Sequence, residues 1–248
     1  MVLRRLFSKA EKPSIPEGER IYAIGDIHGR LDLTLKALDE IHRHNDSRVG
    51  SEVIFLGDYI DRGPDSAGVV EAITTDERLK EFRTTFLKGN HEATLLDFLE
   101  DAGVGPSWSQ FGGQDALISY GVQPPLSKTD IDAWEECRQA FRDALPIEHK
   151  AFYAGLSLSA ERGDYLFVHA GVDPNKPLSK QTEADYLWSR EAFMTDGRRL
   201  DKVIVHGHTP EAKAHKDKRR VGLDTGAYQT GRLSVAYFEG EAVHFWST

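Results

Sequence analysis

Five short apolar runs along the chain each end in a glycine-flanked loop that carries Asp, Asn or His. Short runs rich in β-branched and aromatic residues and stopped by glycine are typical of buried strands. The runs cover residues 21–24, 53–56, 84–88, 165–168 and 203–205. The loop after the first run carries Asp26 and His28, and the next four loops carry, in order, Asp58, Asn90, His169 and His208. Loops at strand ends are where α/β folds bind ligands. If these loops were ordinary polar turns, an apolar run followed by a glycine-flanked Asp, Asn or His would have arisen by chance five times. The pattern therefore predicts a ligand site at these loops.

The loop after residues 53–56 concentrates charge. Asp58 lies at the tip of the predicted strand, a Gly-Pro pair forces a turn, and Asp61 and Arg62 add a second carboxylate and a guanidinium. Such a cluster is costly to bury unless something pairs it, and a metal ion with a phosphate would do so. Taken alone, this stretch is equally consistent with a polar turn that holds a local Asp–Arg ion pair.

The order of the elements predicts a mixed α/β fold. Apolar residues at helical spacing over residues 31–41 follow the first loop, so residues 21–56 resemble a βαβ unit. Near the C-terminus, residues 221–227, 233–238 and 242–246 are predicted to form consecutive strands joined by short turns. Such connections imply antiparallel pairing, so we expect a partly antiparallel sheet.

Residues 93–164 differ from the rest, because their apolar positions follow helical spacing. We interpret them as a mostly helical insertion that lies beside the site and helps to choose the substrate, or that covers one edge of the sheets. No change in composition divides the remainder of the 248 residues. We therefore expect one domain over residues 19–248 behind a flexible arm over residues 1–18.

The composition argues against several classes of protein. No apolar segment approaches the ~20 residues needed to cross a bilayer, and the N-terminus lacks the apolar region of a signal peptide. The single cysteine, Cys137, excludes an intrachain disulfide and fits a reducing cytoplasm. A formal net charge of −9 argues against a dedicated nucleic-acid binder, so we expect no nucleic-acid or membrane partner. The basic residues within 213–220 are expected to form a solvated loop.

The loops supply carboxylate and amide oxygens and imidazole nitrogens, with no thiolate. This mixture suits Mn, Fe, Co or Zn. The candidate ligands are Asp26, His28, Asp58, Asn90, His169 and His208. They are too many for one ion that must also keep a position open for water, but they suit two ions about 3.5 to 4 Å apart that share a carboxylate.

The same residues suit hydrolysis of a phosphate ester. Two divalent ions and two carboxylates leave about two positive charges, which hydroxide and an anionic substrate would balance, and metal-bound water with a pKa of about 7 would be the nucleophile. His91 is the candidate acid for the leaving group, and Asp61 would orient it and hold it charged. Arg62 and Arg190 offer planar forks that could grip phosphate oxygens.

Five motifs carry a family resemblance: Gly-Asp-Ile-His-Gly, Gly-Asp-Tyr-Ile-Asp-Arg-Gly, Gly-Asn-His-Glu, His-Ala-Gly and Gly-His-Thr-Pro. Over about residues 21–235 the sequence resembles the calcineurin-like metallophosphoesterases, and within them the bacterial and phage branch of the phosphoprotein phosphatase family. The resemblance implies an α/β fold built as a two-layer β-sandwich flanked by helices, with a dinuclear site between the sheets. We expect two divalent ions, Mn first, with Fe, Zn or Co as alternatives.

The resemblance also implies a role for each site residue. Asp26 and His28 would bind the first metal, Asp58 would bridge, and the second metal would be bound by Asn90, His169 and His208. His91 with Asp61 would form the acid pair, and Arg62 and Arg190 would hold phosphate. His206 occupies a position that is usually apolar in the family, and we expect it to support a ligand or to be purely structural.

Two substrate classes compete within this branch. Protein phosphatases act on phosphoserine and phosphothreonine, and diadenosine tetraphosphate hydrolases cleave an anhydride. Residues 61–62 and 90–92 look more like the phosphatases, so we expect a phosphorylated protein or a small phosphoester as substrate. The walls that choose it are expected around Trp108, Phe111 and Tyr120 and the loop 213–220. A non-catalytic metal-binding interaction domain is the third, weaker alternative, because no catalytic position is missing.

Overall fold

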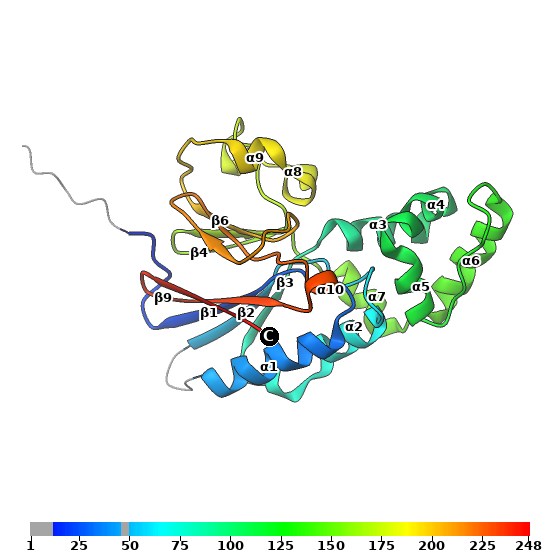
Figure 1. Cartoon of the computed structure of the whole chain (residues 1–248), viewed down its shortest axis with the longest axis horizontal. Helices are drawn as coiled ribbons and strands as arrows, with labels where there is room; N and C mark the ends of the chain where they lie inside the picture. The colour runs from blue at the N-terminus through cyan, green and yellow to red at the C-terminus, as the bar shows by residue number, and fades with distance from the viewer. Residues whose placement is uncertain (1–11, 46–49) are drawn as a thin grey trace, which may run out of the picture.

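Two five-stranded sheets lie against each other in the computed structural model, which describes residues 12–45 and 50–248. Helices flank them, as Figure 1 shows. The helices and short helical turns are α1 Leu31–His44, α2 Ser66–Thr75, η1 Glu77–Glu81, α3 Asn90–Glu100, η2 Ala102–Val104, α4 Gly105–Trp108, η3 Ser109–Gly113, α5 Gln114–Ser119, α6 Ile131–Ala144, α7 Ile147–Ala154, η4 Leu178–Lys180, α8 Glu183–Trp188, α9 Glu191–Thr195 and α10 Ala227–Thr230. The two-layer α/β architecture expected from the sequence is confirmed.

The first sheet has the strand order β10-β9-β1-β2-β3. Its strands are β1 Glu19–Ile24, β2 Gly50–Phe55, β3 Arg83–Phe86, β9 Ser234–Glu239 and β10 Ala242–Ser247. The first three run parallel to one another, while β9 is antiparallel to both β1 and β10. The predicted βαβ unit is therefore confirmed as β1, α1 and β2.

The second sheet has the order β4-β5-β6-β8-β7. Its strands are β4 Ser159–Arg162, β5 Tyr165–Val168, β6 Val203–His206, β7 His215–Lys216 and β8 Arg220–Gly222. Three of them, β5, β6 and β8, run parallel, and antiparallel strands close both edges. Each sheet thus contributes three parallel strands whose carboxyl ends lie at one edge.

The central strands are buried on both faces. In β1, Tyr22 and Ile24 belong to the core beneath the flanking helices, while Ile21 and Ala23 belong to the core between the sheets. Side chains alternate between the faces of a strand, so both faces must be apolar when both are covered. This explains why the strands appear in the sequence as unbroken apolar runs.

One strand pairing predicted from the sequence is wrong. Residues 221–227 and 233–238 do not form a hairpin, because β8 lies between β6 and β7 in one sheet while β9 lies beside β1 in the other. After β8 the chain turns at Gly226, whose φ is 65°, into α10 and crosses between the sheets. The predicted antiparallel pair of β9 and β10 is confirmed.

Residues 93–164 contain most of α3, then α4 to α7, and also β4, an edge strand of the second sheet. Figure 1 shows α3 to α6 extending to one side of the two sheets. Their interior is aromatic and contains the buried side chains of Phe98, Trp108, Trp134 and Phe141. This helical body adjoins the carboxyl end of β3.

The expected flexible arm over residues 1–18 lies partly outside the described residues, which begin at Lys12. Within the described part, Ser14 N donates to the Asp164 carboxylate (2.9 Å) and Ile15 N donates to Gly240 O (3.1 Å). Ile15 is buried in the core between the sheets. The chain is therefore held in place from Ser14 onward, because an apolar side chain fills space between the layers.

An ion pair between the buried Glu52 and the half-buried Arg162 joins the two sheets. Glu52 on β2 is 1% exposed and accepts bonds from Arg162 Nε on β4 and from Thr85 Oγ1, each 2.7 Å long. Burial opposes ionisation, but the Arg162 guanidinium and the Thr85 hydroxyl outweigh it and lower the pKa of Glu52. Because the folded-state pKa is depressed, this stabilisation is complete above the unfolded glutamate pKa of about 4.3 and is lost as pH falls below it.

We therefore expect Glu52→Gln to lower the free energy of unfolding at pH 7 by about 2 kcal/mol, typical of lost charged hydrogen bonds. The difference from the unsubstituted protein should shrink as pH falls below about 4. Urea unfolding across this range measures both effects. Glu161→Gln, which removes an exposed pair with Lys202, is the control and should cost little. A difference that stays constant down to pH 3 would contradict this account of Glu52.

None of the helices in the described residues combines the length and apolar character needed to span a bilayer.

Candidate metal centre

The site lies where the parallel strands of both sheets end. In the first sheet, Asp26 and His28 follow β1, Asp58 follows β2, and Asn90 begins α3 after β3. In the second sheet, His169 follows β5 and His208 follows β6. These six side chains are all buried. The structure therefore brings the predicted ligands to one edge of the sandwich from positions far apart in the sequence.

Asp58 lies at the centre of this arrangement. Its Oδ2 is 3.5 Å from His28 Nε2 and its Oδ1 is 3.3 Å from His169 Nε2. Two groups of potential ligands share this carboxylate, namely His28, Asp58 and His91, and Asp58, His169 and His208, with the ligand atoms of each group within 4.8 Å of one another. One carboxylate that faces imidazoles on both sides has the geometry of a bridge between two ions.

Asn90 and Asp26 lie beside these groups. Asn90 Oδ1 is 2.9 Å from His169 Nε2, which in turn is 3.2 Å from His208 Nδ1. Asp26 is in neither group; its Oδ2 accepts from His208 N (2.9 Å), and its buried Oδ1 has no hydrogen-bond partner among the described residues. A buried oxygen without a donor is costly unless a cation or water meets it.

Backbone carbonyls fix how two of the rings are oriented. His28 Nδ1 donates to Ile60 O (2.8 Å) and His169 Nδ1 donates to Leu56 O (2.9 Å), since a carbonyl oxygen can only accept. The Nε2 atoms of both rings are thereby turned toward Asp58. Such bonds to the far nitrogen are typical of metal-binding histidines, and the donor set fits borderline divalent cations.

The pKa values of the imidazoles are shifted in opposite directions. Burial lowers the pKa of His28 to about 3 and that of His208 to about 2, which leaves both rings neutral. For His169, burial is outweighed by the Asp58 carboxylate, which raises the pKa to about 10. A divalent cation would compete with that proton for the same nitrogen.

Backbone strain is concentrated in these loops. The non-glycine residues with φ in the left-handed region, between 48° and 72°, are His28, Asp58, Asp61, Arg62 and His208. Each such residue costs about 1 to 3 kcal/mol and persists only where its surroundings hold it. Two glycines permit the close approach: a Cβ at Gly207 would lie 1.9 Å from Asp26 Oδ1, and one at Gly89 would lie 2.1 Å from Asp58 Oδ1.

Glu92 holds the strained loop in place, a role the sequence analysis did not assign. Its fully buried carboxylate accepts from the backbone N–H groups of Asp58 (2.9 Å), Tyr59 (2.8 Å) and Gly89 (2.9 Å). It thereby ties the loop after β2 to the start of α3. A glutamate three residues after the N-cap Gly89 is the spacing of a capping box, which could have signalled this role.

The predicted acid pair lies next to the shared carboxylate. His91 Nδ1 is 2.5 Å from Asp61 Oδ2, and His91 Nε2 is 3.9 Å from Asp58 Oδ2. Burial opposes a charge on His91, but the carboxylates of Asp58 and Asp61 outweigh it and raise the pKa of the imidazole. A charged His91 would carry a proton on Nε2, which points to the centre of the site, once the Arg62 guanidinium no longer donates to that nitrogen.

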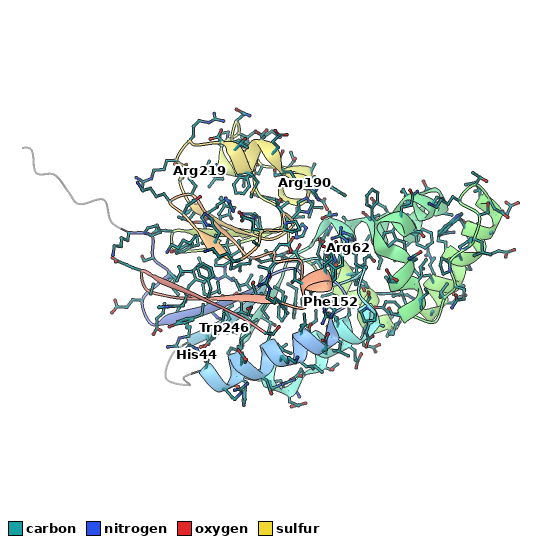
Figure 2. The ribbon with its side chains drawn as sticks, viewed as in Figure 1. His44, Arg62, Phe152, Arg190, Arg219 and Trp246 are labelled. Carbon is teal, nitrogen blue, oxygen red and sulfur yellow. The ribbon has the colours of Figure 1, made fainter. Side chains whose placement is uncertain are left out.

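The two predicted phosphate-binding arginines contact opposite sides of the cluster. The guanidinium of Arg62 lies 3.0 Å from His28 Nε2 and 2.9 Å from His91 Nε2. Arg190, at the start of α9, donates from Nε to His208 Nε2 (2.8 Å). Figure 2 shows Arg62 near the helical body and Arg190 beside α8, so a phosphate between them would be held from two directions.

Of the residues predicted to form a substrate wall, Trp108 is buried and Tyr120 is half-buried. Trp108 is only 1% exposed, and the Tyr120 hydroxyl bonds to His149 Nδ1 (2.8 Å) inside the helical body. The Trp108 ring fills the interior of the insertion, and the Tyr120 ring is half-buried and packs against that interior. Phe111 is 66% exposed, and its carbonyl accepts from Arg62 Nε (3.4 Å), so it does border the site.

Within the basic loop 213–220, the cations of the turn before β8 do not border the site. Because β8 runs parallel to β6, the turn before β8 lies at the opposite end of the strands from His208. Arg219 Nε donates to Arg198 O (2.7 Å), and the buried Arg220 pairs with Glu211 (2.7 Å). Residues 217–220 therefore do not form the expected wall, whereas Lys213 precedes β7 at the end of the sheet where β8 finishes.

The structure adds residues that the sequence analysis did not choose. Asp224 follows β8 and is buried; burial, with help from the charge of Asp58, raises its pKa to about 6. Its apolar run and glycine-flanked loop repeat the pattern of the other strand ends, so that pattern could have found it. Tyr228 lies under Arg62, with the guanidinium carbon 5.0 Å from the ring centroid, and Trp188 is 53% exposed beside His208.

His206 lies outside both ligand groups. Its Nε2 is 3.3 Å from an Arg220 nitrogen, and its ring meets Phe193 edge-on at 5.1 Å. These contacts favour the purely structural alternative for this histidine.

Comparisons with known proteins agree with this geometry. Residues 19–243 match the family described as Calcineurin-like phosphoesterase. The chain is 36% identical to serine/threonine-protein phosphatase 2 of Escherichia coli (strain K12), covering 86% of this chain and 90% of the relative. It is 25% identical to the asymmetrical bis(5'-nucleosyl)-tetraphosphatase PrpE of Anoxybacillus flavithermus, covering 91% and 93%. The crystal structure of a proposed diadenosine tetraphosphatase superposes with a TM-score of 0.61 at 20% identity, covering 92% and 93% of the chains.

Proposed function

The chain belongs to the calcineurin-like phosphoesterase family, and we propose that this metallophosphoesterase is a phosphomonoesterase whose main substrates are phosphoserine and phosphothreonine in proteins. One observation carries the choice of substrate. Among the described residues, the cations that contact the ligand cluster are Arg62 and Arg190, enough for one phosphoryl group. A tetraphosphate would need several further cations, and the basic turn before β8, with Lys218 and Arg219, lies at the far end of the strands from the site.

We propose two divalent ions as cofactors, Mn first, with Fe, Zn or Co as alternatives. The residues proposed to hold them are Asp26 and His28 for the first ion, Asp58 between the two, and Asn90, His169 and His208 for the second. When bound, these ions would lower the pKa of a coordinated water toward about 7 and so supply the nucleophile.

The chain's own residues supply the remaining steps. Arg62 and Arg190 would hold the phosphoryl oxygens from two sides and fix the orientation of the ester. His91 would donate its Nε2 proton to the departing alkoxide, and Asp61 would keep the ring oriented and charged throughout. Both groups are buried, so bulk water does not compete for the proton.

Hydrolysis of a dinucleoside tetraphosphate is the second candidate function. The half-exposed Trp188 lies with its ring centroid 6.3 Å from that of His208 and could stack a nucleobase beside the phosphates. The relative from Anoxybacillus flavithermus carries the name of that activity.

We expect exhaustive chelation to abolish activity and added Mn to restore it, because the nucleophile depends on the metal. The test compares a phosphoserine peptide, an aryl phosphate and diadenosine tetraphosphate side by side, with bound metal measured in the same samples. The phosphopeptide and the aryl phosphate should be turned over well above the dinucleotide. Full activity after metal removal would exclude the proposed mechanism, and a kcat/KM for the dinucleotide about tenfold above the best phosphopeptide would favour the second function.

We also propose that the protein works in the bacterial cytoplasm. The single cysteine, Cys137, is buried in the helical body and free, which suits a reducing compartment.

A further inference from the structure

We propose that Trp108, which the helical insertion delivers, is a positioning residue for the acid pair of His91 and Asp61. Its indole would fix the plane of the Asp61 carboxylate and, through it, the direction in which His91 presents its proton. The inference deepens the proposed phosphomonoesterase function and rests on it.

The hydrogen bonds around Asp61 carry the first part of the argument. Trp108 Nε1 donates to Asp61 Oδ2 (2.8 Å), the same oxygen that His91 Nδ1 meets at 2.5 Å. The other oxygen, Oδ1, has no partner among the described residues although it is buried. Without the indole, the bond from His91 would be the one hydrogen bond from the described residues that fixes the Asp61 side chain, and the carboxylate could turn about its Cβ–Cγ bond.

The backbone around Asp61 shows that the insertion is built against this point. Asp61 and Arg62 both have left-handed φ values, 72° and 67°, and Arg62 N donates to Gly112 O (3.1 Å) in the turn η3. A Cβ at Gly112 would lie 2.5 Å from Arg62 Cγ, and one at Gly113 would lie 2.4 Å from the Trp108 ring. This kinked turn, in which Gly112 has a φ of 106°, thus packs closely against Arg62 and against the indole at once.

Trp134 provides a matched comparison within the same helical body. It is as buried as Trp108, it also meets the Phe98 ring, and its Nε1 also donates a hydrogen bond, to Ser127 O (3.0 Å). The two tryptophans therefore contribute similar packing and one hydrogen bond each. They differ in that only the bond of Trp108 ends on the acid pair.

The kinetic test compares Trp108→Phe with Trp134→Phe in the Mn-loaded enzyme. We expect Trp108→Phe to lower kcat for a phosphoserine peptide about 10- to 100-fold, the usual cost of removing a group that orients a site residue. The loss should be smaller for an aryl phosphate, whose leaving group needs little protonation, and metal content should not change. Trp134→Phe should lower the melting temperature similarly and leave both rates near normal.

A second readout does not depend on turnover. In the metal-free protein, the Nδ1 proton of His91 should give a resolved NMR signal, assigned by its loss in His91→Ala. We expect this signal to shift and to exchange faster with water in Trp108→Phe but not in Trp134→Phe. This arm distinguishes a failure of the positioning role from a failure of the phosphomonoesterase proposal, because it needs no substrate.

If Trp108→Phe does not fold, replacing the Trp108 indole N–H with sulfur, as benzothienylalanine, removes the donor and keeps the ring shape. An unchanged His91 signal in that protein, or in Trp108→Phe, would overturn the proposal. The proposal would also be overturned if Trp108→Phe and Trp134→Phe lost the same rate and each lost it equally for both substrates. That result would show that the indoles act through packing alone.

Discussion

Asp58→Asn is expected to release both metal ions and to lower the turnover of every phosphoester by about 10³-fold or more. Metal ions contribute several kcal/mol of transition-state stabilisation, and each 1.36 kcal/mol is worth a factor of ten. Asp58 is the carboxylate common to both ligand groups, with one oxygen toward His28 and the other toward His169. An amide keeps the shape but loses the negative charge.

The fold of this variant should be retained. Asparagine tolerates the left-handed backbone that Asp58 adopts at φ 52°, and Glu92 would still accept from the backbone N–H of residue 58. Bound metal, measured by elemental analysis together with the rate, therefore reports on the bridge itself.

Substitutions of two further carboxylates serve as comparisons for Asp58→Asn. Asp26→Asn should be less damaging, since Asp26 lies beside the ligand groups and is proposed to serve one ion. Asp65→Asn, in the same loop, should leave metal and rate intact, because Asp65 caps α2 by accepting from Gly68 N (2.8 Å) and asparagine caps equally well. Two bound ions and near-normal rates in Asp58→Asn would show that Asp58 is not the bridge.

The position of the site could be predicted from the sequence because of one physical constraint. Strands covered on both faces must be apolar throughout, so β1, β2, β5 and β6 stand out as runs, and their glycine-rich ends stand out as loops. Parallel strands then bring those ends to one edge. Asp58 and His169 lie on different sheets, so it was the shared loop pattern of glycine with Asp, Asn or His that grouped them, and not strand pairing.

Contacts made across the fold could not be predicted in this way. The bond from Trp108 to Asp61 spans 47 residues and depends on how the helical body sits against the sheet. The sequence showed only that Trp108 belongs to the insertion beside the site, where we expected it to form part of a wall that chooses the substrate. The packing of α3, α4 and α6 instead turns its ring inward.

Short connections misled the prediction at β8 and β9. Local pattern favours a hairpin wherever two apolar runs lie close in sequence. Here the backbone of the residues after β8 bonds to β6, as Leu223 N does to His206 O (2.8 Å), and the chain then crosses to the other sheet. The strand that β8 pairs with, β6, comes earlier in the sequence, so local spacing between β8 and β9 could not reveal this pairing.

His91→Ala is expected to lower the rate for an alkyl phosphoserine by about 10² to 10⁴, the usual contribution of a positioned general acid, with metal content unchanged. His91 bonds to Asp61 and faces the shared carboxylate, but no ion is proposed to depend on it. The rate for an aryl phosphate should fall much less, because an aryl oxide leaves without a proton. Rates for several leaving groups, measured with bound metal, separate the two effects.

Controls for His91→Ala must address Arg62, whose guanidinium rests 2.9 Å from His91 Nε2 and could move once the ring is gone. Inhibition by free phosphate reports on that arginine and should be unchanged. Asp61→Asn should show the same dependence on the leaving group, since it keeps the ring but removes the anion that holds its charge. His215→Ala, remote from the acid pair and paired with Asp217, should have no effect. Equal losses for alkyl and aryl substrates in His91→Ala would mean that His91 positions phosphate or metal and is not the acid.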